Sequence, residues 1–301
     1  MFYCATGKML GDGNNGRVLN VWSKGVAPRI FYIKPTDTTA NGGAMTWEGM
    51  GAGIAFDPTV SAAPATGFIT SLDIDNVTLS ADDNVNGAGI SYDWIAIYAD
   101  DTYFSSGTYS GNASSSNVVS VPNLMDWGFI KRNGGSAGVQ YTNHNTRTKP
   151  FSATNPSTSL IGNVTSSQFE VISSSSTVNV SGTNNYFYFC LTFPTGLAYG
   201  GSYTATGTDD TAENDPNFPT VAVLLSGRSG ARALVMGGSH QSTGDNLVVT
   251  SGVANISDGI KTFTALGFTI GQDNLVNSSG IIYDYIVFGD EAVTPPAGNG
   301  R

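Results

Sequence analysis

Residues 85–97 read VNGAGISYDWIAI and residues 276–288 read VNSSGIIYDYIVF, so the two stretches align without a gap. A third version lies between them, where residues 178–182 (VNVSG) lead into residues 185–190 (NYFYFC). In each version an Asn and a Gly separate two β-rich runs, and the last run is nearly continuously apolar. Such a run is typical of a strand that is buried on both faces or central in a sandwich. The sequence thus predicts three copies of one hairpin.

The repetition continues upstream of these hairpins. Residues 77–79 fall on residues 268–270 at the same offset, and residues 107–131 resemble residues 201–225 more weakly. In the middle copy Tyr186 falls at the position of Asp93 and Asp284. We also expect Gly89, Gly182 and Gly280 to occupy the same turn.

These matches divide the chain into three modules and a tail. The modules are residues 1–101, 102–195 and 196–292, and residues 293–301 lack the pattern of a strand and are expected to be flexible. Short strands and turn clusters in modules of this length predict three tandem β-sandwiches of jelly-roll type, arranged with pseudo-threefold symmetry.

The composition favours the same all-β class. Gly contributes 38 of the 301 residues and Glu only four, whereas 13 Tyr and 15 Phe accompany many Val, Ile and Thr. Good helix formers are therefore scarce, and residues that suit pleated surfaces and tight turns are common. A hydrophobic content of 40% is too high for a disordered chain.

The sequence gives no sign of a membrane span or a secretory signal. No apolar run reaches the roughly 18 to 20 residues that a membrane helix needs, and residues 1–11 have neither a basic nor an apolar signal region. We therefore expect synthesis in a cytosol. The only cysteines, Cys4 and Cys190, are too few for a disulfide scaffold and are predicted to be two buried thiols.

Charge argues against nucleic acid as a partner. The net charge is −10, and phosphate binding needs a cationic surface. Residues 1–101, 102–195 and 196–301 carry net charges of −6, +2 and −6. The middle module is therefore expected to lie in different surroundings, unless drift and solubility alone explain the asymmetry.

Two glycine-rich motifs match catalytic patterns but fail the test of context. Residues 11–16 fit the dinucleotide-binding pattern but lead into a predicted strand where that fingerprint requires a helix, so they are predicted to form a turn. Residues 134–138 fit the nucleophile-elbow spacing but lie between two predicted strands, so they are predicted to form a hairpin loop.

Histidine supplies no catalytic or metal site in this sequence. The two histidines, His144 and His240, fall at nearly corresponding places in the second and third modules, and the first has Trp47 nearby. They are interpreted as a remnant of a shared ancestor. We predict a protein that is not an enzyme and has no catalytic residue, cofactor or metal.

Two sets of acidic residues remain as candidates. A calcium-binding loop is weighed against a solvated loop for one cluster, which comprises Asp209, Asp210, Glu213, Asn214 and Asp215. Its spacing matches no calcium motif, so the solvated loop is preferred. Asp93 and Asp284 are expected to hydrogen-bond a neighbouring loop, because a catalytic role would require a second carboxylate at a set distance.

Several segments of the middle module form a recognisable set: Gly107-x-Tyr109-x-Gly111-Asn112, Trp127–Arg132, the segment around Arg147, Gln168–Val171 and the hairpin Asn179–Phe189. Through these segments the module, over about residues 103–192, resembles a sandwich domain that recurs in structural proteins of tailed bacteriophages. The outer modules match only in their closing hairpins and one earlier strand. The resemblance implies a virion protein, assembled in the host cytoplasm and without catalytic residues.

Two functions follow as expectations. The first is a capsid decoration or cement protein that clamps neighbouring capsomers, with the major capsid protein or other virion proteins as partners. The second is an adhesive module of a tail or head fibre that binds a host-surface glycan as lectins do. The sequence has no coiled-coil heptads for a fibre shaft, which favours decoration.

Overall fold

The computed structural model describes residues 1–36, 42–58, 60, 62–144, 146–150, 160–181, 185–229, 234–241, 246–249 and 255–290. These residues form 25 β-strands and one helical turn, α1 (Asn274–Asn277). They build several separate antiparallel sheets, which is consistent with β-sandwich architecture. The all-β prediction is therefore confirmed. The predicted C-terminal tail lies outside the described residues.

The strands fall into three groups along the chain, and each sheet contains strands of one group only. The first group comprises β1 (Phe2–Leu10), β2 (Arg17–Asn20), β3 (Ile30–Pro35), β4 (Ala44–Trp47), β5 (Ile54–Ala55), β6 (Ala65–Thr66), β7 (Ile69–Asp73), β8 (Asn76–Leu79) and β9 (Ser91–Ala99). The second comprises β10 (Phe104–Ser110), β11 (Asn117–Ser120), β12 (Trp127–Arg132), β13 (Val139–Thr142), β14 (Arg147–Pro150), β15 (Ile161–Thr165), β16 (Gln168–Val171) and β17 (Asn185–Leu191). The third comprises β18 (Ala198–Thr204), β19 (Thr211–Glu213), β20 (Ala222–Gly227), β21 (Val235–Gly238), β22 (Leu247–Val248), β23 (Ile260–Phe263), β24 (Phe268–Ile270) and β25 (Ile282–Phe288).

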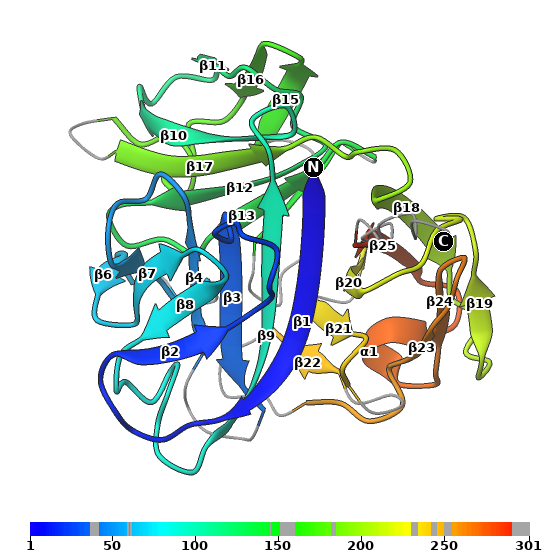
Figure 1. Cartoon of the computed structure of the whole chain (residues 1–301). Helices are drawn as coiled ribbons and strands as arrows, with labels where there is room; N and C mark the ends of the chain where they lie inside the picture. The colour runs from blue at the N-terminus through cyan, green and yellow to red at the C-terminus, as the bar shows by residue number, and fades with distance from the viewer. Residues whose placement is uncertain are drawn as a thin grey trace, which may run out of the picture.

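Each group has a larger and a smaller sheet, and the strand order recurs between groups. The larger sheets run β1-β9-β3-β4, β10-β17-β12-β13-β14 and β18-β25-β20-β21-β22. The smaller sheets run β2-β8-β7, β11-β16-β15 and β19-β24-β23, and the first group adds the hairpin β5-β6. In every group the last strand pairs with the first. Figure 1 shows the first group in blue to cyan, the second in green at the top and the third in yellow to red at the right.

The last strand of each group supplies two different cores, because side chains alternate between the faces of a strand. In β17, Phe187 and Phe189 face a core that all three groups share, whereas Tyr186 and Tyr188 face a core within the second group. The same division holds for β9 and β25. The prediction of a strand buried on both faces is therefore confirmed.

Aromatic rings link the three groups inside the shared core. Phe189 lies with its ring centroid 5.2 Å from that of Trp47 and 5.0 Å from that of Trp127. Trp127 in turn lies 5.5 Å from Phe288 of the third group, and Phe288 stacks on Phe2 at 6.4 Å. Each such ring buries roughly 150–250 Å² of surface. The shared core therefore holds the larger sheets of all three groups together.

A buried asparagine holds the turn before the last strand of each group in place through hydrogen bonds. Asn86, Asn179 and Asn277 are all 1% exposed or less. Asn179 Nδ2 donates to Asn112 Oδ1 at 3.0 Å and to the carbonyl of Ser114 at 2.7 Å, and its Oδ1 accepts from the Asn112 amide at 2.9 Å. Such a side chain uses its full hydrogen-bonding capacity to join two loops that are distant in sequence. The Asn in the repeated pattern is therefore structural.

A tyrosine hydroxyl hydrogen-bonds to the backbone of the same turn in each group, and these bonds show which residues are equivalent. The hydroxyls of Tyr92, Tyr186 and Tyr283 each accept from the amide directly after the buried Asn and donate to the carbonyl three residues before it. Tyr186 is thus equivalent to Tyr92 and Tyr283, and Phe187 occupies the position of Asp93 and Asp284. The expected alignment was wrong by one residue, because the turn of the middle group is one residue longer.

The glycines of this turn adopt the conformation that only glycine adopts readily. Gly89 and Gly280 have φ of 75° and 77°, in the left-handed region. This agrees with the expected shared turn for those two residues. Gly182 lies outside the described residues.

Candidate functional site

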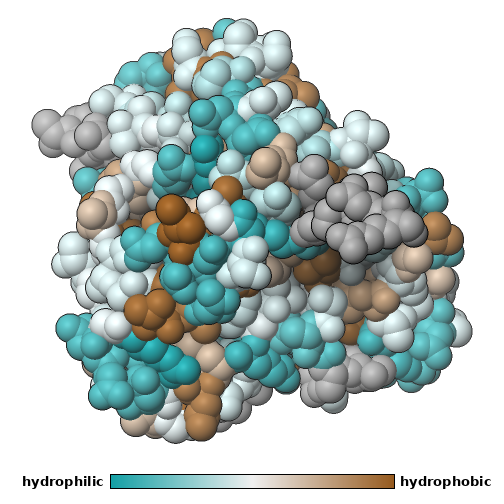
Figure 2. Space-filling view, in the orientation of Figure 1, coloured by the Kyte–Doolittle hydropathy of each residue, from teal (hydrophilic) through white to brown (hydrophobic). Residues whose placement is uncertain are grey.

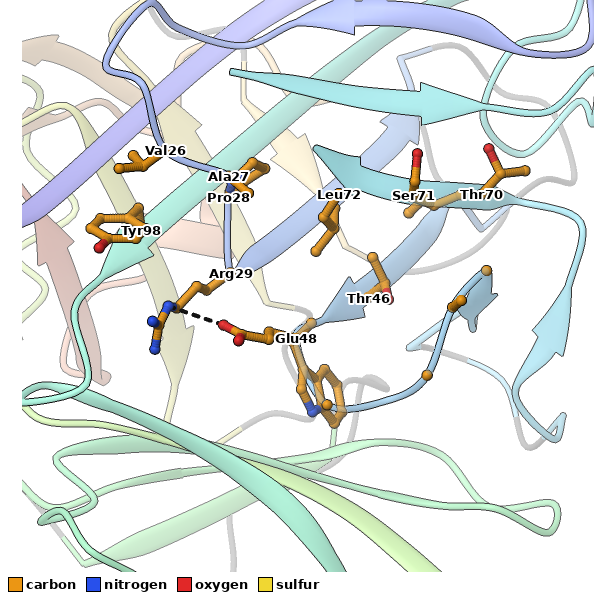
Figure 3. Close-up of a pocket in the computed structure, with 16 residues that line it drawn as sticks. Val26, Ala27, Pro28, Arg29, Thr46, Glu48, Thr70, Ser71, Leu72 and Tyr98 are labelled. Carbon is orange, nitrogen blue, oxygen red and sulfur yellow. Dashed lines mark ion pairs between the residues drawn. The ribbon is translucent and has the colours of Figure 1, made fainter. Parts of the chain in front are cut away.

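A pocket of about 670 Å³ lies in the first strand group. We call it the first pocket. Its walls come from the loop before β3, the end of β4, the loop that follows β4, and strands β7 and β9. In Figure 3, Leu72 and Thr46 lie on one side of the pocket and Tyr98 on another, with the Arg29–Glu48 pair between the strands. This volume is within the range of ligand sites, roughly 300–1,000 Å³.

The polar edge of the first pocket is built on Arg29. Its guanidinium lies 3.0 Å from Glu48 and 2.7 Å from Asp101, and it packs over the rings of Tyr98 and Phe104 at 5.5 and 5.4 Å. The Arg29 side chain is only 17% exposed, whereas those of Glu48 and Asp101 are 56% and 91% exposed. The charge that a ligand meets at this edge is therefore negative.

A second pocket, of about 500 Å³, lies where the second and third groups meet, and we call it the junction pocket. It combines aromatic and acidic walls, formed by Asp126, Asn143, His144, Phe193, Thr195, Gly196, Ala198, Tyr199, Gly200, Asp215, Pro216 and Phe218. The Asp126 carboxylate is held in place, because it accepts from the Phe193 amide at 2.9 Å and from Asn143 Nδ2 at 3.4 Å.

The two histidines occupy corresponding positions but different surroundings. Thr142 pairs with Trp127, and Gly238 pairs with Ala222, so His144 and His240 each lie two residues beyond the end of an equivalent strand. His144 lines the junction pocket. His240 instead contacts the first group, where its Nε2 lies 3.1 Å from Asp93. The structure therefore does not bring the two imidazoles together.

Asp93 and Asp284 lie at boundaries between groups. Asp93 is fully buried in β9 and accepts from Gln241 and Asn255 of the third group at 2.9 and 3.1 Å, besides its contact with His240. Burial alone would raise the pKa of Asp93, but the hydrogen bonds from His240 and Gln241 hold it below its usual value. The expectation that Asp93 bonds a neighbouring loop is confirmed.

Asp284 forms the corresponding polar contact of the third group. Arg228 donates to it through Nε at 2.9 Å and Nη2 at 2.7 Å. Its other neighbour is Lys149 of β14, which lines with it a small cavity of about 20 Å³ between the second and third groups. Asp93 therefore joins two strand groups through hydrogen bonds, whereas the hydrogen bonds of Asp284 go to Arg228 of its own group.

Two buried lysines complete these boundaries. Lys131 is fully buried and donates to the carbonyls of Ala62 and Val60 of the first group at 2.7 and 3.4 Å. Burial lowers its pKa to about 8, although Asp57 opposes the shift. Burial likewise lowers the pKa of Lys149, which is 3% exposed, to about 8 against the attraction of Asp284.

These lysines predict a rise in stability with pH. The pKa of each lysine is about 8 in the folded chain and about 10.5 in the unfolded chain. Its contribution to the free energy of unfolding is therefore fully present above pH 10.5 and is lost as the pH falls from 10.5 through 8. Between pH 7.5 and 8.5 the two together should add about 1 kcal/mol to the free energy of unfolding. Chemical denaturation across this range measures the effect.

The matched control is the double variant Lys131→Met and Lys149→Met, which should remove the rise and leave a small fall with pH, because burial raises the pKa of Cys4 and of Cys190. Burial, and then the charge of Asp215, raises the pKa of Glu213 to about 7. Below about pH 7.5 this carboxyl makes stability fall as the pH rises, so the range starts at about pH 7.5. A flat profile in the unmodified chain would show that the two ammonium groups are better solvated than their burial indicates.

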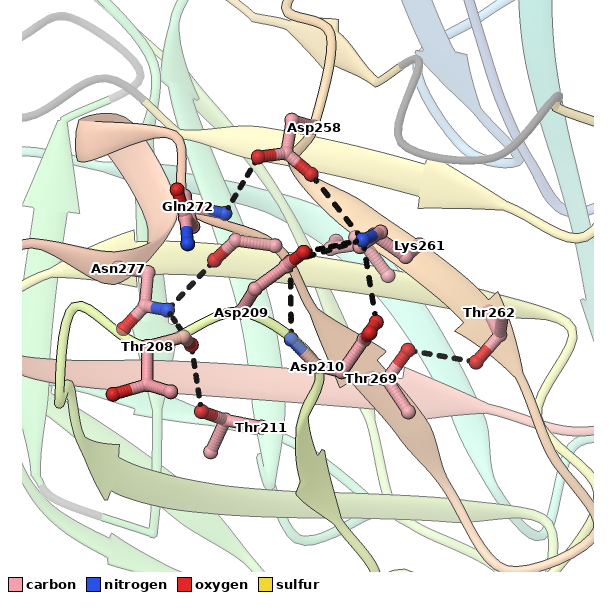
Figure 4. A network of polar contacts seen from close by, with 12 residues as sticks. Thr208, Asp209, Asp210, Thr211, Asp258, Lys261, Thr262, Thr269, Gln272 and Asn277 are labelled. Atoms are coloured by element: carbon pink, nitrogen blue, oxygen red, sulfur yellow. Dashed lines mark hydrogen bonds and ion pairs between the residues drawn. The ribbon is translucent and has the colours of Figure 1, made fainter.

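The acidic loop of the third group is occupied by a lysine. Figure 4 shows the Lys261 amino group between Asp209, Asp210 and Asp258. Its Nζ lies 2.9, 3.3 and 3.6 Å from carboxylate oxygens of these residues. The ammonium group of Lys261 neutralises part of the negative charge of this loop, for which the sequence had left a calcium ion as an alternative. The other predicted members do not join it, since Asp215 lines the junction pocket and Glu213 is half-buried.

The remaining candidates have structural roles. Gly13 and Gly16 have positive φ values in a turn before β2, and residues 134–138 join the paired strands β12 and β13, so both loop predictions are confirmed. Cys4 and Cys190 are buried as predicted. In the described part of the chain, no three His, Cys, Asp or Glu residues cluster in a way that could hold a metal ion. None of the helices described there is long and apolar enough to cross a membrane.

Sequence reasoning missed the Arg29 edge of the first pocket and the buried lysines. Lys131 carried a signal, because it follows the apolar pair Phe129-Ile130 within a strand where a charge is unexpected. Arg29 carried none, since its partners Glu48 and Asp101 are distant in sequence and become neighbours only through the fold.

Comparisons with known proteins add no family to these observations. No protein-family model matches this chain. No curated protein matches it either. The resemblance of residues 103–192 to a bacteriophage sandwich domain, and the function drawn from it, therefore stay predictions.

Proposed function

We propose that the chain is a structural protein of a bacteriophage virion that decorates the capsid and clamps neighbouring capsomers. In this proposal, residues 1–101, 102–195 and 196–292 are tandem jelly-roll-like sandwiches arranged about a pseudo-threefold axis. The chain then acts as a single-chain counterpart of a trimer. It has no catalytic role, and its partners are the major capsid protein or other virion proteins.

The observation that supports this arrangement is a closed cycle of contacts between the three groups. The loops that follow β4, β13 and β21 each touch the next group in cyclic order: Gly49 lies against Ser106, His144 lies against Gly200, and His240 bonds Asp93. The third contact returns from the last group to the first. A cyclic set of this kind is what three copies related by a threefold axis produce.

This cyclic arrangement of the three groups suits a threefold site on a protein shell. A homotrimer presents three identical patches to such a site, and a single chain presents three similar patches without the entropic loss of assembling three subunits. Fusion also lets the copies diverge, which fits net charges of −6, +2 and −6 over residues 1–101, 102–195 and 196–301 in a shell whose neighbours are not strictly equivalent.

The surface favours several modest contacts over one dominant patch. The exposed large apolar residues are spread over all three groups, as Met1, Leu10, Val18, Ile74, Val118, Leu266 and Ile282. On the face shown in Figure 2, brown apolar areas alternate with teal hydrophilic ones. Three weak contacts on one rigid body bind tightly together, because the first raises the effective concentration of the others.

The test is sedimentation of the full chain with undecorated shells of the virus that encodes it. The full chain is required because the three groups share one core. Saturation at one chain per threefold position is the expected result. Failure to sediment with shells, or saturation at three chains per position, contradicts a single-chain clamp.

The alternative, an adhesive module of a tail or head fibre, has one observation in its favour. The junction pocket combines aromatic rings with carboxylate and amide groups, as glycan sites do. A chain that binds host-cell glycans but no shell would fulfil this second proposal.

A further inference from the structure

We propose that the junction pocket binds a neutral saccharide. This inference rests on the second function proposed above, because it names the class of glycan that the junction pocket would take. A saccharide site in this pocket is compatible with a chain on a capsid as well as with a chain on a fibre.

The walls have the two kinds of surface that a pyranose ring requires. Phe193 and Tyr199 are half-buried, so part of each ring is available to a ligand, and Phe218 is buried behind them. Aromatic rings offer an apolar face with a polar rim, which suits the C–H face of a sugar. The volume of about 500 Å³ is within the range of small-molecule sites.

The polar groups are placed to receive hydroxyls. Asp126 is fixed by the Phe193 amide and by Asn143, yet a carboxylate has about four lone-pair sites and therefore keeps capacity for a ligand. Asp215 and His144 are exposed at the same pocket. A saccharide hydroxyl donates to a carboxylate and accepts from an amide or an imidazole N–H, so this set matches vicinal hydroxyls.

The charge of the lining selects against anionic ligands. The lining contains two aspartates, and none of the described residues in it is Lys or Arg. Phosphate, sulfate and acidic sugars would meet two carboxylates without a cation to balance them. A neutral hexopyranoside or N-acetylhexosaminide meets no such penalty.

The equivalent places in the other groups have lost these features. In the first group Gly49 stands at the position of His144, and Arg29 with Glu48 stand where Asp126 and Asn143 stand in the second. In the third group His240 is engaged by Asp93. The site is therefore expected once per chain, with weak affinity for a single sugar that multiple chains on one particle would strengthen.

The experiment is saturation-transfer NMR on the full chain with a panel of neutral methyl hexopyranosides and N-acetylhexosaminides. We expect saturation of the ring protons of at least one glycoside. The Asp215→Ala and His144→Ala variants, which change exposed side chains, should weaken that binding at least tenfold while the denaturation midpoint stays unchanged. Tyr199→Ala should abolish it.

Glu48→Ala, in the first pocket, is the matched control and should bind as the unmodified chain does. If only Glu48→Ala loses the signal, the sugar occupies the first pocket and the proposal is wrong. It is also wrong if no glycoside on the panel binds. Binding of spermidine that depends on Asp215, with no glycoside binding, would identify a cation site instead.

Discussion

Replacing Phe189 with Ala is expected to lower the free energy of unfolding by about 3–5 kcal/mol, the usual loss for a large aromatic side chain in a core. Phe189 is fully buried and contacts Trp47 of the first group as well as Phe104, Trp127 and Phe129 of its own. The cavity left by the ring would border residues of two groups. Since whole domains are stable by only about 5–15 kcal/mol, the loss is large.

The more informative result is the shape of the transition. Because the core is shared, guanidinium denaturation of the variant should still show one transition, shifted to lower denaturant, by fluorescence and by circular dichroism alike. Val118→Ala, at a side chain that is 53% exposed, is the control and should leave the midpoint unchanged. If the second group melted first while the others stayed folded, the three groups would be independent and the shared core would not couple them.

Replacing Asn179 with Ala is expected to cost about 2–4 kcal/mol, since it leaves several buried polar groups without partners. The substitution removes acceptors for the Asn112 amide and Asn117 Nδ2 and a donor to Ser114, at a position with no exposure to water. The denaturant midpoint of the purified variant measures the loss.

The equivalent change Asn86→Ala provides a second arm of this test. Asn86 bonds Asp12 and Asn14 in the first group much as Asn179 bonds its partners. Similar losses are expected at both positions, and Asn133→Ala, at an exposed residue of the second group, should have no effect. A loss under about 0.5 kcal/mol at both would mean that the repeated Asn reflects ancestry rather than stability.

The last strand of each group could be predicted because its signal is local. Its apolar side chains alternate between two cores, so the sequence shows a continuous apolar run, as in residues 185–190. The turn before each strand could be located from its Asn and Gly. The one-residue error at Tyr186 arose because a longer turn does not change the apolar pattern that follows it.

The pockets and the boundaries between groups could not be predicted, because their residues come together only when the chain has closed on itself. Asp93 was identified as unusual, but its partners Gln241 and Asn255 lie about 150 positions away in the third group. The junction pocket similarly joins Asp126 to Asp215. Repetition in the sequence indicates that copies exist and says little about which of their surfaces meet.

Electron cryomicroscopy of particles that carry the bound full chain would show whether the protein is a single-chain clamp at a threefold position. We expect the density of one chain centred on each local threefold position, with each strand group over a different capsomer. Density on the tail, or at the capsid away from those positions, would contradict it.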